Sequence, residues 1–198
     1  MNPVKGVDFA FWYILGVSVF LLVAITAAMI LFAVKYRRSK NPVPSDIRDN
    51  WKLEIAWTVV PTIIALSMFA VGWSSYVGLR NVPDDAIEIE LFAQQFSWLF
   101  VYDNDKESED ELVVPVGKAI KLNITSEDVL HGFSLPAFRI KVDAVKGLNT
   151  YAWFLADRVG EFDIHCSEYC GVNHSLMSGK LRIVQEKEYQ AWLEEEEE

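Results

Sequence analysis

Two long apolar segments stand out in the N-terminal part of the chain. Residues 9–34 contain no charged side chain, and neither do residues 55–79. A helix needs about 20 apolar residues to cross a bilayer, and both segments are long enough to do so with some tilt. The alternative is a pair of buried core helices, but a protein of 198 residues is too small to surround two such helices. We therefore expect two transmembrane helices in these segments.

The loop between the two helices, residues 35–54, carries six basic and three acidic side chains. Short basic loops remain in the cytoplasm, so this loop is predicted to be cytoplasmic. The segment 9–34 is also longer than the apolar core of a signal peptide, which has about 7–15 residues. The chain is therefore expected to be a multi-pass protein of the bacterial cell (inner) membrane, with both termini on the periplasmic or external side.

After these helices the pattern changes to short segments in which apolar and polar side chains alternate. In residues 86–92 isoleucine and leucine alternate with glutamate, and in residues 95–102 aromatic side chains fall at every second position. Similar segments continue to residue 184, interrupted by an acidic loop at residues 103–111, and residues 185–193 are expected to form a short helix. Several short strands separated by turns predict an all-β sandwich.

The predicted fold class is thus two N-terminal transmembrane α-helices followed by a C-terminal all-β sandwich. The expected parts are a helical hairpin over residues 1–80, an external domain over residues 81–193 and an acidic tail over residues 194–198. Residues 80–198 carry 24 acidic and 11 basic side chains. This charge excludes nucleic acid as a partner, because nucleic acid binds basic patches. It favours a basic protein partner, whose encounter with the domain it would accelerate.

The candidate chemistry lies in one stretch, HCSEYCGVNHSLM, which contains the only two cysteines of the chain, Cys166 and Cys170. A disulfide is one interpretation, because an external compartment is oxidising. A metal site is the other. Cys170, His174 and Met177 follow one another in the order in which a single-copper cupredoxin presents its thiolate, imidazole and thioether. His131, on an earlier predicted strand, fits as the second histidine of such a site. The sandwich is therefore expected to be cupredoxin-like.

A second thiolate distinguishes this sequence from a one-copper site. Thiolate and thioether ligands select copper, and imidazole serves it well. Two thiolates can bridge two coppers, with His131 and His174 each completing one of them and with Met177 and the backbone carbonyl of Glu168 as weak axial ligands. Zinc competes on ligand type, since two cysteines and two histidines form a common zinc set, but a structural zinc site has no use for the methionine. The predicted metal ligands are His131, Cys166, Glu168, Cys170, His174 and Met177.

The whole arrangement resembles subunit II of the haem–copper cytochrome c oxidases, which carries a dinuclear copper centre, CuA, on a cupredoxin domain. Besides the motif H…C-S-E-x-C-G-x-x-H-x-x-M, the resemblance covers residues 54–61 (EIAWTVVP), 126–131 (SEDVLH) and 141–144 (KVDA). It implies a respiratory-chain oxidoreductase and translocase. Its CuA subunit accepts electrons from a cytochrome c-type donor on the acidic face and passes them to haem in the catalytic subunit I. Oxygen is reduced there, coupled to proton translocation, so this chain holds no catalytic residue. Other oxidase subunits are implied as further partners.

The same resemblance implies further roles. The Glu168 side chain would reach a magnesium ion at the boundary with the catalytic subunit, and the alternative is an ordinary solvated glutamate. Glu54 would lie at the entrance of a proton path, or would be an interfacial acid. Phe96 stands where the family has the tryptophan that receives electrons, and Trp98 stands at the second aromatic position. His165 is expected to point away from the metal, because adjacent strand residues face opposite sides.

Two other functions compete with an oxidase subunit. A CuA-containing subunit of a membrane nitric oxide reductase would use the same site for a different acceptor. A stand-alone membrane-anchored copper protein would fold and act without a haem partner. The identity of the catalytic partner separates these alternatives.

Overall fold

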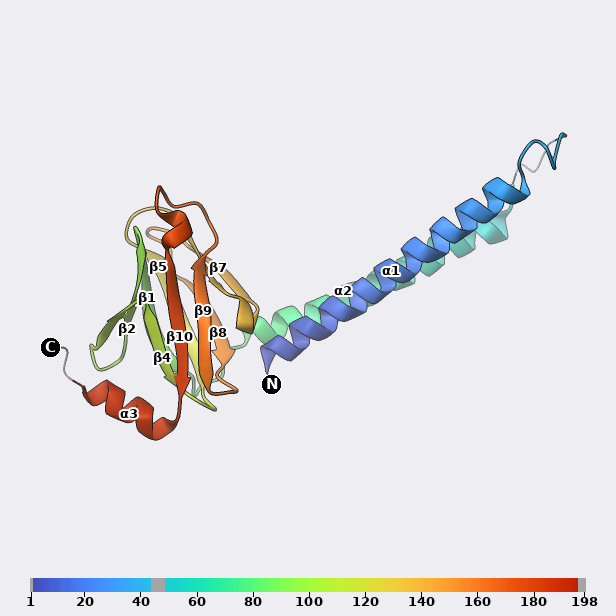
Figure 1. Ribbon diagram of the computed structural model, residues 1–198. Coiled ribbons are helices and arrows are strands. Elements are labelled where there is room, and N and C mark those ends of the chain that lie inside the picture. Colours follow the sequence, from blue (N-terminus) through green and yellow to red (C-terminus); the bar gives the residue numbers. More distant parts are fainter. Residues whose placement is uncertain (1, 44–48, 196–198) are drawn as a thin grey trace. The chain divides into compact units, whose positions relative to one another are not determined.

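A computed structural model of the protein describes residues 2–43 and 49–195. It confirms the predicted fold class, because two N-terminal helices precede a β-sandwich with ten strands in the described part of the chain (Figure 1). Residues 44–48 of the predicted cytoplasmic loop lie outside the described residues, as do residues 196–198 of the predicted tail. Glu194, the first residue of that tail, ends helix α3 (Glu186–Glu194).

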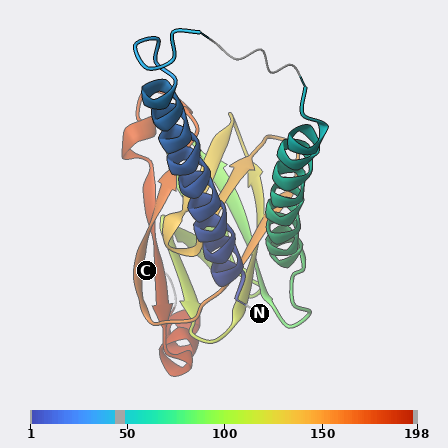
Figure 2. The ribbon, with the colours of Figure 1, turned by 90° about the vertical axis from the view of Figure 1, so that its right-hand side faces the viewer.

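The two apolar segments form helices α1 (Pro3–Lys35) and α2 (Trp51–Arg80), which run in opposite directions as a hairpin (Figure 1, Figure 2). Polar contacts join them: the Tyr13 hydroxyl lies 2.7 Å from that of Ser67, and the Ser75 hydroxyl donates to the Gly6 carbonyl at 2.9 Å. No side chain in the most apolar window of either helix is buried in the described structure. This exposure argues against core helices of a soluble protein and leaves both apolar surfaces to be covered by lipid or by other helices.

The sandwich consists of two five-stranded sheets with strand orders β3-β2-β1-β5-β8 and β4-β10-β9-β6-β7. Strand β1 pairs in parallel with β5, and β10 pairs in parallel with β4. The strands are β1 Ile87–Gln94, β2 Ser97–Val101, β3 Glu107–Glu109, β4 Glu111–Pro115, β5 Ala119–Ser126, β6 His131–Leu135, β7 Ile140–Ala144, β8 Thr150–Leu155, β9 Gly160–Cys166 and β10 Ser178–Val184.

Two sequence expectations are corrected here. The predicted acidic loop, residues 103–111, contains the short strand β3, which pairs with β2 at the edge of its sheet. An edge strand has only one partner and tolerates charged side chains, so its composition resembles that of a loop. The predicted strand at residues 95–102 begins only at Ser97, because Gln95 and Phe96 form the turn between β1 and β2.

Alternation along the strands directs one side of each sheet into a shared core. The largest fully buried aromatic side chains are Trp98, Phe100, Phe133, Phe138 and Phe154. Three connections are tied together by hydrogen bonds: the β1–β2 turn, the loop between β5 and β6, and the loop between β9 and β10. The backbone N–H of Gln95 donates to Asp128 at 2.7 Å, and the side-chain amide of Gln95 donates to the Cys170 carbonyl at 2.5 Å. The predicted site residues lie in or beside these connections.

Candidate metal centre

The last two residues of β9, His165 and Cys166, point to opposite faces of the sheet, because side chains alternate along a strand. Cys166 and Ile164 face the core, whereas Asp163 and His165 are exposed on the outer side. The strand pairing places Cys166 opposite Phe133 and His165 opposite Ser134. His165 therefore lies on the face away from the cysteine sulfur, as the sequence pattern predicts.

The donor atoms of the predicted ligands gather in one small volume. One nitrogen of His131 and the sulfurs of Cys166 and Cys170 lie within 4.8 Å of one another, and all three residues are buried. Met177 Sδ lies 3.2 Å from His131 Nδ1 and 3.8 Å from Cys170 Sγ. His174 Nδ1 lies 3.7 Å from Cys170 Sγ, and the carbonyl oxygen of Glu168 lies 3.2 Å from Cys166 Sγ. The structure thus brings six predicted ligands together from the start of β6, the end of β9 and the loop between β9 and β10.

Both cysteines are free thiols, and their sulfurs are 3.7 Å apart. A disulfide bond is about 2.05 Å long, so the structure contains the thiol form of this pair. Burial, and then the neighbouring Cys166, raise the pKa of the Cys170 thiol to about 11. Thiols must lose their protons to bind a metal, so metal binding here releases protons. The donor set of two thiolates, two imidazoles and a thioether fits copper, and the thioether favours copper over zinc.

His131 is fully buried and has a different partner on each ring nitrogen. Nδ1 faces the sulfur atoms, while Nε2 lies 2.8 Å from Asp128 Oδ1. A carboxylate at Nε2 favours the tautomer that carries its proton there, which leaves Nδ1 free to bind a metal. Burial raises the pKa of Asp128, but hydrogen bonds from His131, Val129 and Gln95 outweigh burial, and the net pKa lies below its usual value.

The two aromatic residues near the site differ in exposure. Phe96 is half-buried, and its ring lies 3.0 Å from the position that a Cβ atom on Gly171 would take. Phe96 therefore packs directly on the loop that carries the predicted ligands, beside Cys170. Trp98 is fully buried; its ring centroid lies 6.2 Å from that of His131 and 5.5 Å from that of Phe133. Trp98 thus lies beneath the site and away from the protein surface.

The remaining predicted residues lie outside the cluster of donor atoms. The Glu168 carboxylate forms an ion pair with Lys141 at 2.9 Å. Glu54 lies in the first turn of α2 and is exposed. Sequence reasoning gave no role to Asp128 or Gln95, although Asp128 is three residues before His131 and Gln95 precedes the aromatic position. Gln95 Nε2 donates to the Cys170 carbonyl at 2.5 Å.

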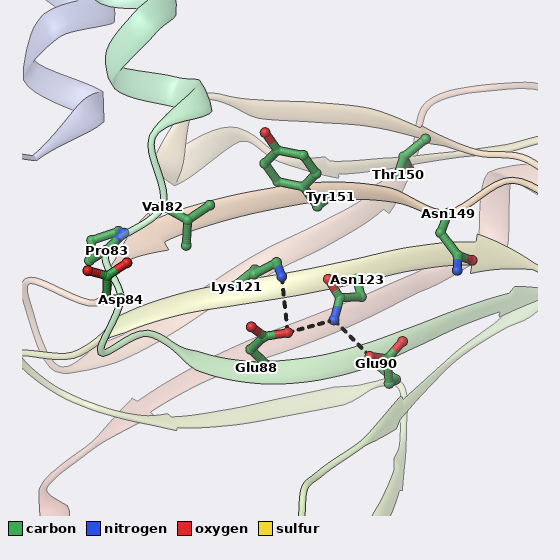
Figure 3. Close-up of a pocket in the computed structure, with 10 residues that line it drawn as sticks. All are labelled: Val82, Pro83, Asp84, Glu88, Glu90, Lys121, Asn123, Asn149, Thr150 and Tyr151. Atoms are coloured by element: carbon green, nitrogen blue, oxygen red, sulfur yellow. Dashed lines mark hydrogen bonds and ion pairs between the residues drawn. The ribbon is translucent and has the colours of Figure 1, made fainter.

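A cleft of about 540 Å³ lies elsewhere, on the outer face of β1, β5 and β8 (Figure 3). Its polar side chains bind one another: Lys121 pairs with Glu88 at 3.0 Å, and Asn123 donates to Glu88 and to Glu90 at 3.1 and 2.7 Å. Asn123 and then Lys121 lower the pKa of Glu88. None of the six predicted metal ligands lines this cleft, so it is separate from the metal centre.

We predict that Gly171→Ala disturbs the Phe96 side of the centre. Gly171 has φ +146°, a conformation that other residues rarely adopt, and an added Cβ would lie 2.7 Å from Gln95 Nε2 and 3.0 Å from the Phe96 ring. The backbone strain alone costs about 1–3 kcal/mol. We expect faster copper loss and a changed Phe96 environment, measured by chelator competition and by NMR of labelled phenylalanine.

The matched control for this substitution is Gly160→Ala. Gly160 has φ +152°, but the atom nearest to an added Cβ would be in the Phe162 ring at 3.4 Å, close to ordinary van der Waals distance. This control carries similar backbone strain far from the turn at Gln95. Equal copper loss in both variants would show that the contact with Phe96 is unimportant.

Comparison with known proteins agrees with this geometry. The family model described as "Cytochrome C oxidase subunit II, periplasmic domain" matches residues 86–184, and the one described as "Cytochrome C oxidase subunit II, transmembrane domain" matches residues 3–75. The crystal structure of the periplasmic domain of cytochrome oxidase subunit II from Bradyrhizobium japonicum has 34% sequence identity and a TM-score of 0.56, and covers 58% of this chain and 95% of that one.

Two curated relatives extend the match over both parts of the chain. Cytochrome c oxidase subunit 2 of Alkalihalophilus pseudofirmus is 35% identical in an alignment of 193 positions that covers 91% of this chain and 56% of the relative. Cytochrome c oxidase subunit 2 of Cereibacter sphaeroides is 30% identical in a gapped alignment of 222 positions that covers 89% of this chain and 73% of the relative. The chain thus spans just over half the length of the first relative. With a matched membrane hairpin, a matched sandwich and a clustered set of copper-type ligands, the chain belongs to the cytochrome c oxidase subunit II family, whose members are subunits of haem–copper oxidases.

Proposed function

We propose that this chain is the electron-accepting subunit of a haem–copper terminal oxidase and holds a dinuclear CuA centre. The observation that supports this most strongly is the convergence of His131, Cys166 and Cys170 within 4.8 Å, with a second histidine and a methionine beside them. Held by these residues, a copper pair would supply one-electron redox chemistry between a cytochrome c-type donor and haem in the catalytic subunit. Oxygen reduction coupled to proton translocation belongs to that partner subunit.

The distances suggest how the ligands divide between two metal ions. Cys166 and Cys170 lie between the two histidines and would supply bridging thiolates. His131 and Met177 would serve one ion, because His131 Nδ1 and Met177 Sδ are 3.2 Å apart. His174 and the Glu168 carbonyl remain for the other. Burial of both cysteines and of His131 would exclude water from the ions, which limits the solvent rearrangement during electron transfer.

Electrons are proposed to enter beside Phe96. Its ring packs on Gly171, next to Cys170, and is partly exposed, whereas Trp98 is buried. Strand β3, Glu107–Glu109, pairs with β2 on the same sheet, and its two exposed glutamates offer an acidic surface for a basic donor. Surface charge accelerates association mainly at low salt, so donor oxidation is expected to slow as ionic strength rises.

We propose that the second partner, the haem–copper catalytic subunit, contacts the loop between β9 and β10. Exposed apolar side chains of that loop would form the contact. Tyr169, Val172 and Leu176 are 78%, 88% and 75% exposed, although all three are large hydrophobic residues. Exposed apolar groups in one patch mark interaction surfaces. They flank His174, so a haem–copper subunit seated here would lie next to a copper ligand.

Magnesium does not fit the residues of this chain alone. Glu168 offers a single carboxylate, and that carboxylate is already paired with Lys141. Magnesium held through one protein carboxylate needs further oxygen ligands. Glu168 would bind the ion only together with groups of the catalytic subunit.

We also propose an orientation of the chain in the membrane. The basic loop between α1 and α2 would face the cytoplasm, and the sandwich would lie on the periplasmic or external side of a bacterial inner membrane. Glu54, in the first turn of α2, would then lie at the cytoplasmic end of that helix, where a proton path into the catalytic subunit can begin.

Electron paramagnetic resonance of the copper-loaded full chain in detergent tests the proposed centre. A mixed-valence dinuclear spectrum is expected. A one-copper spectrum, or zinc as the metal retained after purification, would refute it. The acceptor is tested on the purified complex: turnover of O2 supports an oxidase, whereas turnover of nitric oxide alone would identify a nitric oxide reductase. Purification without any haem protein would favour a stand-alone copper protein.

A further inference from the structure

Gln95 donates a hydrogen bond to each side of the candidate metal centre. Its backbone N–H donates to Asp128 Oδ2 at 2.7 Å, and its side-chain amide donates to the Cys170 carbonyl at 2.5 Å. The other oxygen of Asp128 lies 2.8 Å from His131 Nε2. These contacts form a continuous path from His131 to Cys170 that does not pass through the metal.

The path is firmly held at both ends. Asp128 Oδ1 also accepts the Val129 N–H at 2.6 Å, which fixes the rotamer of the carboxylate. At the other end, the absence of a Cβ atom at Gly171 lets the Gln95 side chain lie close to the loop, because Gln95 Nε2 is 2.7 Å from the position that an added Cβ would take. A side chain held by several partners can orient a metal ligand, whereas a mobile surface carboxylate cannot.

We propose that Asp128 and Gln95 are positioning residues of the copper centre. Asp128 fixes the His131 tautomer and makes its imidazole a stronger donor, and Gln95 ties that histidine to the loop that carries Cys170. This inference rests on the proposed copper function. A stronger imidazole donor stabilises the oxidised metal, so Asp128 lowers the reduction potential of the centre. The removal of outer hydrogen-bond partners typically weakens metal affinity about 10–100-fold.

Among the described residues, Asp128 supplies the carboxylate that contacts the His131 ring. Glu127 is exposed, and its backbone forms hydrogen bonds: its N–H donates to the Ala93 carbonyl, and its carbonyl accepts from Lys146. Glu168 is paired with Lys141. Glu127→Gln is therefore a matched control, since it removes one negative charge from the same loop without touching the ring.

The first test uses the metal-free full chain in detergent, with nitrogen-labelled histidine. The chain has three histidines, so His131 is assigned by comparison with His165→Ala and His174→Ala. The expected result is a His131 ring that carries its proton on Nε2, and a mixture of tautomers in Asp128→Ala. A proton on Nδ1 in the wild-type chain would overturn the inference whatever the metal turns out to be.

The second test measures the reduction potential and copper affinity of the loaded chain. Asp128→Asn is expected to raise the potential more than Glu127→Gln does, and Asp128→Ala to weaken copper binding about 10–100-fold. Gln95→Met is expected to speed copper loss without altering the His131 tautomer, because the Gln95 backbone contact with Asp128 survives. Equal potentials in Asp128→Asn and Glu127→Gln would overturn the role of Asp128.

The two proposals fail in different ways. A wild-type chain without a mixed-valence spectrum refutes the copper function and, with it, this inference. A normal mixed-valence spectrum, combined with an unchanged tautomer and potential in the Asp128 variants, refutes the positioning role alone.

Discussion

Cys166→Ser is expected to abolish the mixed-valence copper spectrum while leaving a chain that still binds one copper ion. The sulfurs of Cys166 and Cys170 are 3.7 Å apart, close enough to share two metal ions. A serine hydroxyl is a hard, protonated group and cannot replace a bridging thiolate. The remaining thiolate of Cys170 lies 3.7 Å from His174 and 3.8 Å from Met177, and a ring nitrogen of His131 lies within 4.8 Å of it. Two histidines, one cysteine and a methionine are the ligand set of an electron-transfer copper site.

The measurement combines electron paramagnetic resonance with copper-to-protein stoichiometry. Stoichiometry should fall from two ions to one, and the spectrum should become that of a single copper ion. Cys170→Ser is the informative partner variant, because it removes the sulfur that is nearest to both His174 and Met177. It should leave no ordered one-copper site. A persisting mixed-valence spectrum in Cys166→Ser would contradict the bridging role of Cys166.

Trp98→Ala is expected to destabilise the sandwich by about 3–5 kcal/mol, as is typical of large-to-small substitutions in a core. Trp98 is fully buried and packs against His131 and Phe133. The resulting cavity would lie directly beneath a copper ligand, so copper affinity should fall together with stability. Denaturant unfolding of the metal-free chain, followed by circular dichroism, measures the free energy, and chelator competition measures the affinity.

Trp98→Phe is the graded control. The indole nitrogen of Trp98 is buried without a hydrogen-bond partner among the described residues, so phenylalanine removes an unsatisfied donor as well as part of the ring. Its cost should therefore be clearly smaller than that of alanine. A loss below about 1 kcal/mol for Trp98→Ala would mean that the site collapses readily around the missing ring.

Much of the fold follows from patterns along the chain. The uncharged segments predict α1 and α2, and the alternation in residues 86–92 predicts β1, because burial and bilayer thickness act on local sequence. The edge strand β3 was missed because its three residues, Glu107–Glu109, are all polar and depend on pairing with β2. Pairing across a sheet is a tertiary property that a local pattern does not record.

The candidate ligands could be predicted because four of them share one short loop with characteristic spacing. The supporting contacts could not. Gln95 is 75 residues from Cys170, and Asp128 is 33 residues from Gln95, so their hydrogen bonds arise only when three connections meet. The placement of Phe96 in a turn, one residue before β2 begins, also required the structure, since the regular aromatic spacing extends across that boundary.

Because of the order of the strands, a bound metal would also stabilise one sheet of the sandwich. His131 begins β6, Cys166 ends β9, and Met177 directly precedes β10, and these three strands are neighbours in the order β10-β9-β6. A metal held by all three residues would link three adjacent strand ends, where strands otherwise open locally. Amide hydrogen exchange near these ends should slow on copper loading, while exchange in β3, at the edge of the other sheet, should stay unchanged. Copper would thus hold the ends of β6, β9 and β10 together, in addition to carrying electrons.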